Sequence, residues 1–145
     1  MNLHKLFPVA ALALCASACS DGDDSDTDEP SECAERVGTY SNISRVRSGD
    51  CGEISEILET VDRQPTEVES PCTGTIDYAP DNCTVVTEAT CPAEDLGPGW
   101  TSTFLMHAKW NQSGSRGEAV LQVSVDDDSG ANVCFGTYDV EVTRL

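Results

Sequence analysis

The sequence predicts a mainly β domain, an antiparallel meander of about six strands held together by three disulfides. Three observations lead to this prediction. Apolar and polar residues alternate along several segments, clusters of turn-forming residues separate those segments, and six cysteines lie in the same part of the chain. A period of two is typical of half-buried strands. Residues 33–145, 113 in number, are enough for one domain with a single core.

The clearest alternation lies between residues 100 and 144. Three strands are predicted there, separated by turn-rich segments at 111–117 and 127–132. The residues expected to share the buried face are Trp100, Ser102, Phe104, Met106, Ala108 and Trp110, then Ala119, Leu121, Val123 and Val125, then Cys134, Gly136, Tyr138, Val140 and Val142. Short turns between strands of this kind predict a three-stranded antiparallel meander.

A hairpin and a further strand are predicted upstream. Residues 72–78 and 83–91 flank the segment 79–82, in which Pro80 presets the backbone for a turn. Residues 38–47 form the remaining predicted strand.

Residues 53–61 are the expected exception, a short helix. Apolar side chains fall at i, i+3, i+4 and i+7, which is one face of a helix; they are Ile54, Ile57, Leu58 and Val61. Asp50 is placed to cap its start, and Pro65 ends it. The alternative interpretation of the segment is a strand over 56–61.

A sheet with one apolar face needs that face covered. The predicted strands therefore either curl toward a barrel or pack as a two-sheet sandwich. The meander connectivity favours the barrel-like form.

The six cysteines are expected to form three disulfides: Cys33, Cys51, Cys72, Cys83, Cys91 and Cys134. Six cysteines allow 15 pairings. Cys83 and Cys91 lie about 26 Å apart along one predicted strand, too far for a bridge. Cys72 faces Cys91 across the hairpin, so that pair is favoured. Closely spaced Cys-x-x-Cys pairs are absent from the sequence, so no zinc site or other metal or cofactor is predicted.

The first 18 residues are predicted to be a secretory signal peptide. Lys5 supplies a positive charge, and an apolar run of 13 residues follows at 6–18. Such a run is too short to cross a membrane as a stable helix, which takes about 20 residues.

The junction Ala16-Ser17-Ala18-Cys19 resembles the lipobox of bacterial lipoproteins. The resemblance implies cleavage before Cys19 and attachment of lipid to its thiol, with Ser20 pointing to the outer membrane, on its periplasmic or surface face. Lipidation of Cys19 would leave an even number of cysteines for disulfides. The alternative is an ordinary signal peptidase site, which Ala16 and Ala18 also fit. Residues 19–32, acidic and without large apolar side chains, are predicted to be a disordered tether.

The charge of the chain excludes some partners. The whole chain carries a formal charge of −18, and residues 33–145 carry 7 basic and 19 acidic residues. A surface this acidic repels a phosphate backbone, so no nucleic-acid partner is predicted. The expected contact with a membrane is through the lipid on Cys19.

No catalytic motif stands out. His107 is expected on the polar side of a strand, and Ser102, Ser124 and Asp139 lie on nearby strands without a nucleophile-elbow sequence. The run 126–128 is interpreted as a solvated turn rather than a calcium site. The sequence therefore favours a non-catalytic envelope lipoprotein whose β domain binds an unknown ligand or partner protein. The alternative is a small secreted hydrolase that uses paired carboxylates.

Overall fold

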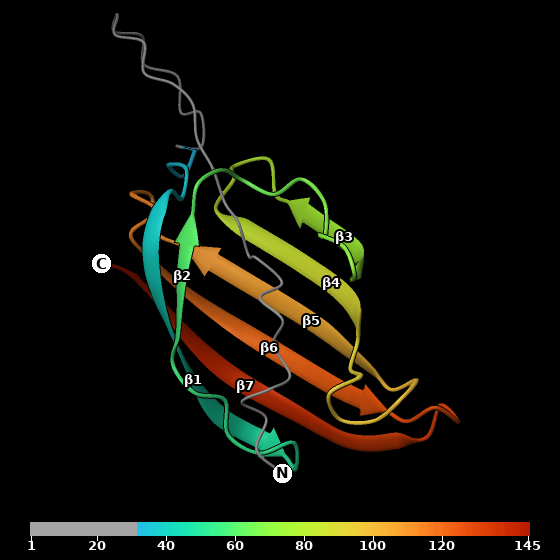
Figure 1. Ribbon diagram of the computed structural model, residues 1–145. Coiled ribbons are helices and arrows are strands. Elements are labelled where there is room, and N and C mark those ends of the chain that lie inside the picture. Colours follow the sequence, from blue (N-terminus) through green and yellow to red (C-terminus); the bar gives the residue numbers. More distant parts are fainter. Residues whose placement is uncertain (1–31) are drawn as a thin grey trace, which may run out of the picture.

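Seven strands make one curled antiparallel sheet in the computed structural model, which describes residues 32–145 (Figure 1). The predicted signal peptide, Cys19 and all but the last residue of the predicted tether lie outside the described residues. The strands are β1 (Gly38–Gly49), β2 (Ile57–Val61), β3 (Thr73–Tyr78), β4 (Thr84–Pro92), β5 (Thr101–Trp110), β6 (Arg116–Asp126) and β7 (Asn132–Arg144). No helix among residues 32–145 is long and apolar enough to cross a membrane.

The strand order confirms the predicted meander and adds one strand to it. The sheet runs β2-β1-β7-β6-β5-β4-β3, so β3 to β7 follow one another as neighbours. β1 pairs with β7, the last strand, and β2 pairs with the far side of β1. The first two strands and the last strand are therefore neighbours in the same sheet. The sandwich alternative is wrong, because no second sheet is present among the described residues.

The sheet curls into a half-barrel that stays open. β2 comes round in front of β1, while β3 forms the opposite edge (Figure 1). β2 pairs only with β1, and β3 only with β4, so within residues 32–145 the two edge strands are not hydrogen-bonded to each other. The chain crosses from one edge to the other through residues 62–72.

Residues 57–61 form a strand, so the predicted helix over 53–61 is wrong. Ile57 and Val61 point to the buried side, whereas Leu58 is 65% exposed. The helical face required Leu58 to be buried. The spacing i to i+4 between Ile57 and Val61 fits one side of a strand as well as one side of a helix. Residues 57–61 form a strand and not a helix because their backbone pairs with Gly38 to Asn42 of β1.

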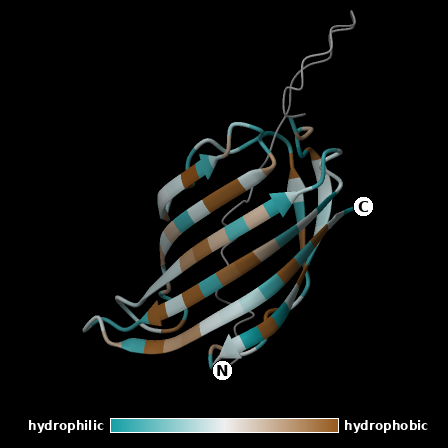
Figure 2. Ribbon diagram, turned by 180° about the vertical axis from the view of Figure 1, so that it is seen from behind, coloured by the Kyte–Doolittle hydropathy of each residue, from teal (hydrophilic) through white to brown (hydrophobic). Residues whose placement is uncertain are grey.

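Alternation gives the sheet an inner and an outer face. The inner face, on the concave side, carries the core: Tyr40, Val61, Val85, Ala108, Trp110, Ala119, Val123, Val125, Tyr138, Val140 and Val142 are buried. The intervening residues of each strand point outward. Seen from behind, the strands show hydrophobic and hydrophilic bands in alternation (Figure 2).

Three disulfides close the domain, as predicted. Cys72 pairs with Cys91, the favoured pair, across the β3–β4 hairpin. Cys33 pairs with Cys83, and Cys51 pairs with Cys134. The exclusion of a Cys83–Cys91 bridge is therefore confirmed. The Cα atoms lie 4.2 Å apart in Cys72–Cys91, 5.0 Å apart in Cys33–Cys83 and 5.1 Å apart in Cys51–Cys134.

Candidate functional site

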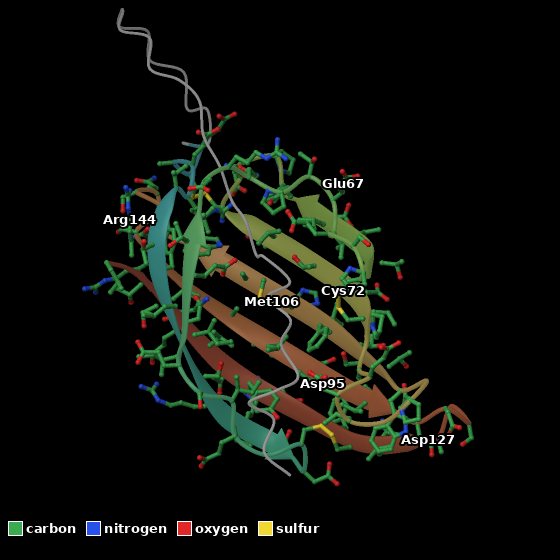
Figure 3. All side chains as sticks on the ribbon, in the orientation of Figure 1. Glu67, Cys72, Asp95, Met106, Asp127 and Arg144 are labelled. Atoms are coloured by element: carbon green, nitrogen blue, oxygen red, sulfur yellow. A yellow bond between two sulfur atoms is a disulfide. The ribbon has the colours of Figure 1, made fainter. Side chains whose placement is uncertain are left out.

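The middle of the inner face is apolar and only partly covered. Five side chains there are half-buried and pack against the core: Ile57, Ile76, Phe104, Met106 and Leu121. We refer to these five residues as the apolar strip. Ile76, Thr87, Met106 and Leu121 occupy one register row across four strands. Figure 3 shows Met106 in the middle of this face, between the two edge strands.

One end of the inner face is closed by the segment between β1 and β2. The Tyr138 hydroxyl donates a hydrogen bond of 2.9 Å to the Gly52 carbonyl, and Ile54 is buried in the core. Burial raises the pKa of the Tyr138 phenol, and the nearby Asp50 adds to the rise. Gly136 makes room for the phenol, since an added Cβ there would lie 2.6 Å from the Tyr138 Oη.

The opposite end is closed by the segment that precedes β1. The Cys33 amide donates to the Asp81 carbonyl at 2.9 Å, and the Ala34 amide donates to the Gln112 carbonyl at 2.7 Å. A close approach at Gly114, whose φ is +63°, allows this packing, because an added Cβ would lie 2.8 Å from the Ala34 carbonyl oxygen. This segment brings Arg36 onto the inner face.

Arg36 is fully buried between aromatic rings. Its relative exposure is 0%, and its guanidinium carbon lies 4.8 Å from the Trp110 ring centre and 5.9 Å from the Tyr78 ring centre. Tyr40 meets Trp110 edge to face, with ring centres 5.7 Å apart. Desolvation lowers the pKa of the Arg36 guanidinium, and Tyr78 and Tyr40 oppose that change.

The Arg36 guanidinium has one hydrogen-bond partner among the described residues. Its Nη2 donates to the Asn82 Oδ1 at 3.4 Å, while Nε and Nη1 have none. The indole Nε1 of Trp110 is likewise buried without a partner in the described part of the chain. The ion pairs in residues 32–145 join Arg45 to Glu141 and Arg47 to Asp139, on the outer face. A buried cation without an opposing charge is costly unless something outside these residues satisfies it.

The strands place one carboxylate on the inner face. Glu59 of β2 lies opposite Tyr40, and the Asn42 side-chain amide donates to it at 3.3 Å. The register directs the other acidic residues of the strands outward; these are Asp77, Glu88, Glu118, Asp126, Asp139 and Glu141. A pair of converging carboxylates is therefore not built by the strands on this face.

The structure does not bring His107 together with Ser102, Ser124 and Asp139. Ser102 is buried on the inner face, where its hydroxyl donates to the Cys91 carbonyl at 3.4 Å. His107, Ser124 and Asp139 point outward from β5, β6 and β7, and His107 is exposed. The aromatic residues Trp110, Tyr40 and Tyr138 belong to the core, and Trp100 packs against it.

The acidic run 126–128 forms the turn between β6 and β7. The Asp127 carboxylate accepts hydrogen bonds from the Ser129 hydroxyl and from the amides of Ser129 and Ala131. These bonds lower the pKa of the Asp127 carboxyl, the Ser129 hydroxyl most of all. Within residues 32–145 no group of three or more His, Cys, Asp or Glu side chains is arranged to hold a metal ion. Figure 3 places Asp95 and Asp127 at the end of the sheet opposite Glu67 and Arg144.

Comparison of the chain with protein-family models, with curated proteins and with solved structures finds no match.

Proposed function

We propose that this chain is an exported lipoprotein, anchored to a membrane through lipid on Cys19, whose β domain binds an apolar ligand on the apolar strip. The observation that carries the proposal is the strip itself. Five apolar side chains lie half-buried on the concave side of a sheet whose edge strands leave that side open. Sites for small molecules are concave and mostly apolar, with a few polar groups.

The three disulfides support the proposal that the protein is exported from the cytosol. Three bridges within one small domain are typical of proteins that leave the cytosol, where thiols are kept reduced. Together with the lipobox-like sequence before Cys19, they favour an envelope lipoprotein on the periplasmic or surface face of the outer membrane. The hydrolase alternative receives no support from the inner face, where the strands place only Glu59.

Ligand binding can be tested with a neutral fluorescent probe, N-phenylnaphthylamine, on the full mature chain. We expect saturable binding that weakens at least about tenfold, or 1.4 kcal/mol, in Met106→Gln, because a polar amide replaces an apolar contact. Leu58→Gln is the matched control, since Leu58 is 65% exposed on the outer face. Equal binding by both variants would refute a site on the apolar strip.

Anchoring can be tested separately by fractionation of cells that produce the chain. We expect the protein in the membrane fraction and Cys19→Ala in the soluble periplasmic or extracellular fraction, because the variant has no thiol to acylate. Retention of Cys19→Ala in the membrane would refute the lipid anchor without affecting the proposal for the ligand.

A further inference from the structure

We infer that Arg36 and Trp110 form a binding site for a carboxylate group, which gives the apolar ligand its chemical class: a monocarboxylic acid with a hydrocarbon chain. This inference deepens the proposed function, because Arg36 closes one end of the inner face that carries the apolar strip. The site consists of the Arg36 guanidinium, the Trp110 indole and Asn82.

Several buried hydrogen-bond donors of this site have no acceptor among residues 32–145. Nε of Arg36 carries one N–H and Nη1 carries two, so three of the five N–H bonds of this side chain have no acceptor in residues 32–145. Trp110 Nε1 is a fourth buried donor without a partner in residues 32–145, on the ring whose centre lies 4.8 Å from the guanidinium carbon. Buried donors on a cation that has no opposing charge in residues 32–145 favour an anionic acceptor.

The surroundings favour a small monoanion. Arg36 is packed between Trp110 and Tyr78 with no exposed surface, so a group with two negative charges would be the more expensive to dehydrate there. The domain's excess of acidic residues also opposes the approach of polyanions. A carboxylate has a single charge and two oxygens, and its geometry matches the planar donors of a guanidinium.

The apolar strip lies next to the Arg36 site along β3 and β5. Tyr78, which contacts Arg36, is two residues from Ile76 on the same face of β3, and Trp110 is four residues from Met106 on the same face of β5. A hydrocarbon chain attached to a carboxylate at Arg36 would therefore run over Ile76 and Met106. Thr87, whose buried Oγ1 has no partner among residues 32–145, lies between these two residues in the register.

Entry of the carboxylate requires the segment before β1 to move. Residues 32–37 carry Arg36 with them and belong to no strand, so their displacement breaks no sheet pairing. It does break the backbone hydrogen bonds from Cys33 to Asp81 and from Ala34 to Gln112. The Cys33–Cys83 disulfide tethers the segment during that movement and limits its extent.

The test measures binding to the full mature chain by calorimetry at constant ionic strength. The probes are acetate, decanoate below its micelle concentration, decanol and chloride, each added to the wild type, to Arg36→Met and to Arg63→Met. Arg63 is exposed and serves as the matched control. Arg36→Met should fold, because replacing a buried charge by an apolar side chain of similar length is often neutral or stabilising.

We expect the wild type and Arg63→Met to bind decanoate more tightly than decanol, and to bind acetate weakly. In Arg36→Met, decanoate binding should weaken at least about tenfold and acetate binding should disappear, with decanol unchanged. Equal binding of decanoate and decanol, unaffected by Arg36→Met, would overturn this inference and leave the apolar ligand in place. Acetate binding that depends on Arg36, without decanol binding, would support the carboxylate site and refute the apolar strip. Chloride binding equal to that of acetate would overturn the choice of a carboxylate.

Discussion

Cys33 and Cys83 are 50 residues apart in sequence, yet their disulfide fixes the segment that carries Arg36 to the residue before β4. Asn82, next to Cys83, strengthens this junction. Its side-chain amide donates to the Cys33 carbonyl at 3.4 Å, and its Oδ1 accepts from Arg36 and from Gln64. The connection between β3 and β4 thus positions a side chain that the sheet itself does not carry.

When the disulfides are removed one at a time, the loss in the free energy of unfolding should be larger for a disulfide that closes a longer loop. The separations are 83 residues for Cys51–Cys134, 50 for Cys33–Cys83 and 19 for Cys72–Cys91. The chain-entropy relation gives losses of about 4.5, 4 and 3 kcal/mol in the free energy of unfolding. Paired Cys→Ala variants, unfolded in denaturant, provide the measurement. A greater loss for the Cys72–Cys91 pair than for the other two would contradict the ranking.

The strand at 57–61 predicts different responses from two neighbouring apolar residues. Val61→Thr should lower the free energy of unfolding by about 1–3 kcal/mol, because Val61 is 2% exposed and the new hydroxyl would be buried. Leu58→Thr should change it by less than about 0.5 kcal/mol, because Leu58 is 65% exposed. Urea titration of the two variants checks both values. Similar large losses would instead indicate a helical face.

Alkaline pH should destabilise the domain through its buried tyrosines. Burial raises the pKa of both Tyr138 and Tyr40 in the folded state. The folded protein therefore retains protons that the unfolded chain loses near pH 10, and the stability they confer falls as the pH rises through the folded pKa values. Tyr138→Phe should lose about 1 kcal/mol at neutral pH, because the bond to the Gly52 carbonyl is gone.

The same variant should show a shallower loss of stability than the wild type as the pH rises above about 10, since one of the two tyrosines no longer titrates. Denaturant unfolding at a series of pH values gives the slope. An unchanged slope in Tyr138→Phe would show that this phenol does not contribute.

The ion pairs on the outer face should contribute little. Arg45 pairs with Glu141 and Arg47 with Asp139 across β1 and β7, and all four side chains are about half exposed or more. A double-mutant cycle with Arg47→Ala and Asp139→Ala should give a coupling of about 0.2–1 kcal/mol that decreases with salt. A coupling above this range at high salt would mean that the pair is shielded from solvent.

Much of the sheet could be predicted because burial on one face imposes a period of two. That pattern predicts the strands that contain Met106, Val123 and Val140, and the hairpin predicts the Cys72–Cys91 pair. Residues 57–61 could not be assigned in the same way. Their apolar spacing fits either a strand or a helix, and pairing with β1 is a non-local contact that no local pattern reports.

The sequence does not indicate Arg36 as a site residue, for a physical reason. It lies outside any strand, so no periodicity indicates its burial, and charged residues are normally exposed. The one indication near Arg36 in the sequence is Cys33. A disulfide from Cys33 to a distant cysteine holds the residues next to it, Arg36 among them, against the folded domain. Which face those neighbours would reach depended on the sheet order, with β1 beside β7.

Intact mass spectrometry of the native protein, after alkylation of free thiols without reduction, tests the central claim most directly. We expect a chain that begins at Cys19, carries acyl groups on that residue and takes up no alkylating agent, because the six remaining cysteines are paired. A chain that lacks acyl groups, or one alkylated at those six cysteines, would contradict the proposal that this β domain is held outside the cytosol by a lipid.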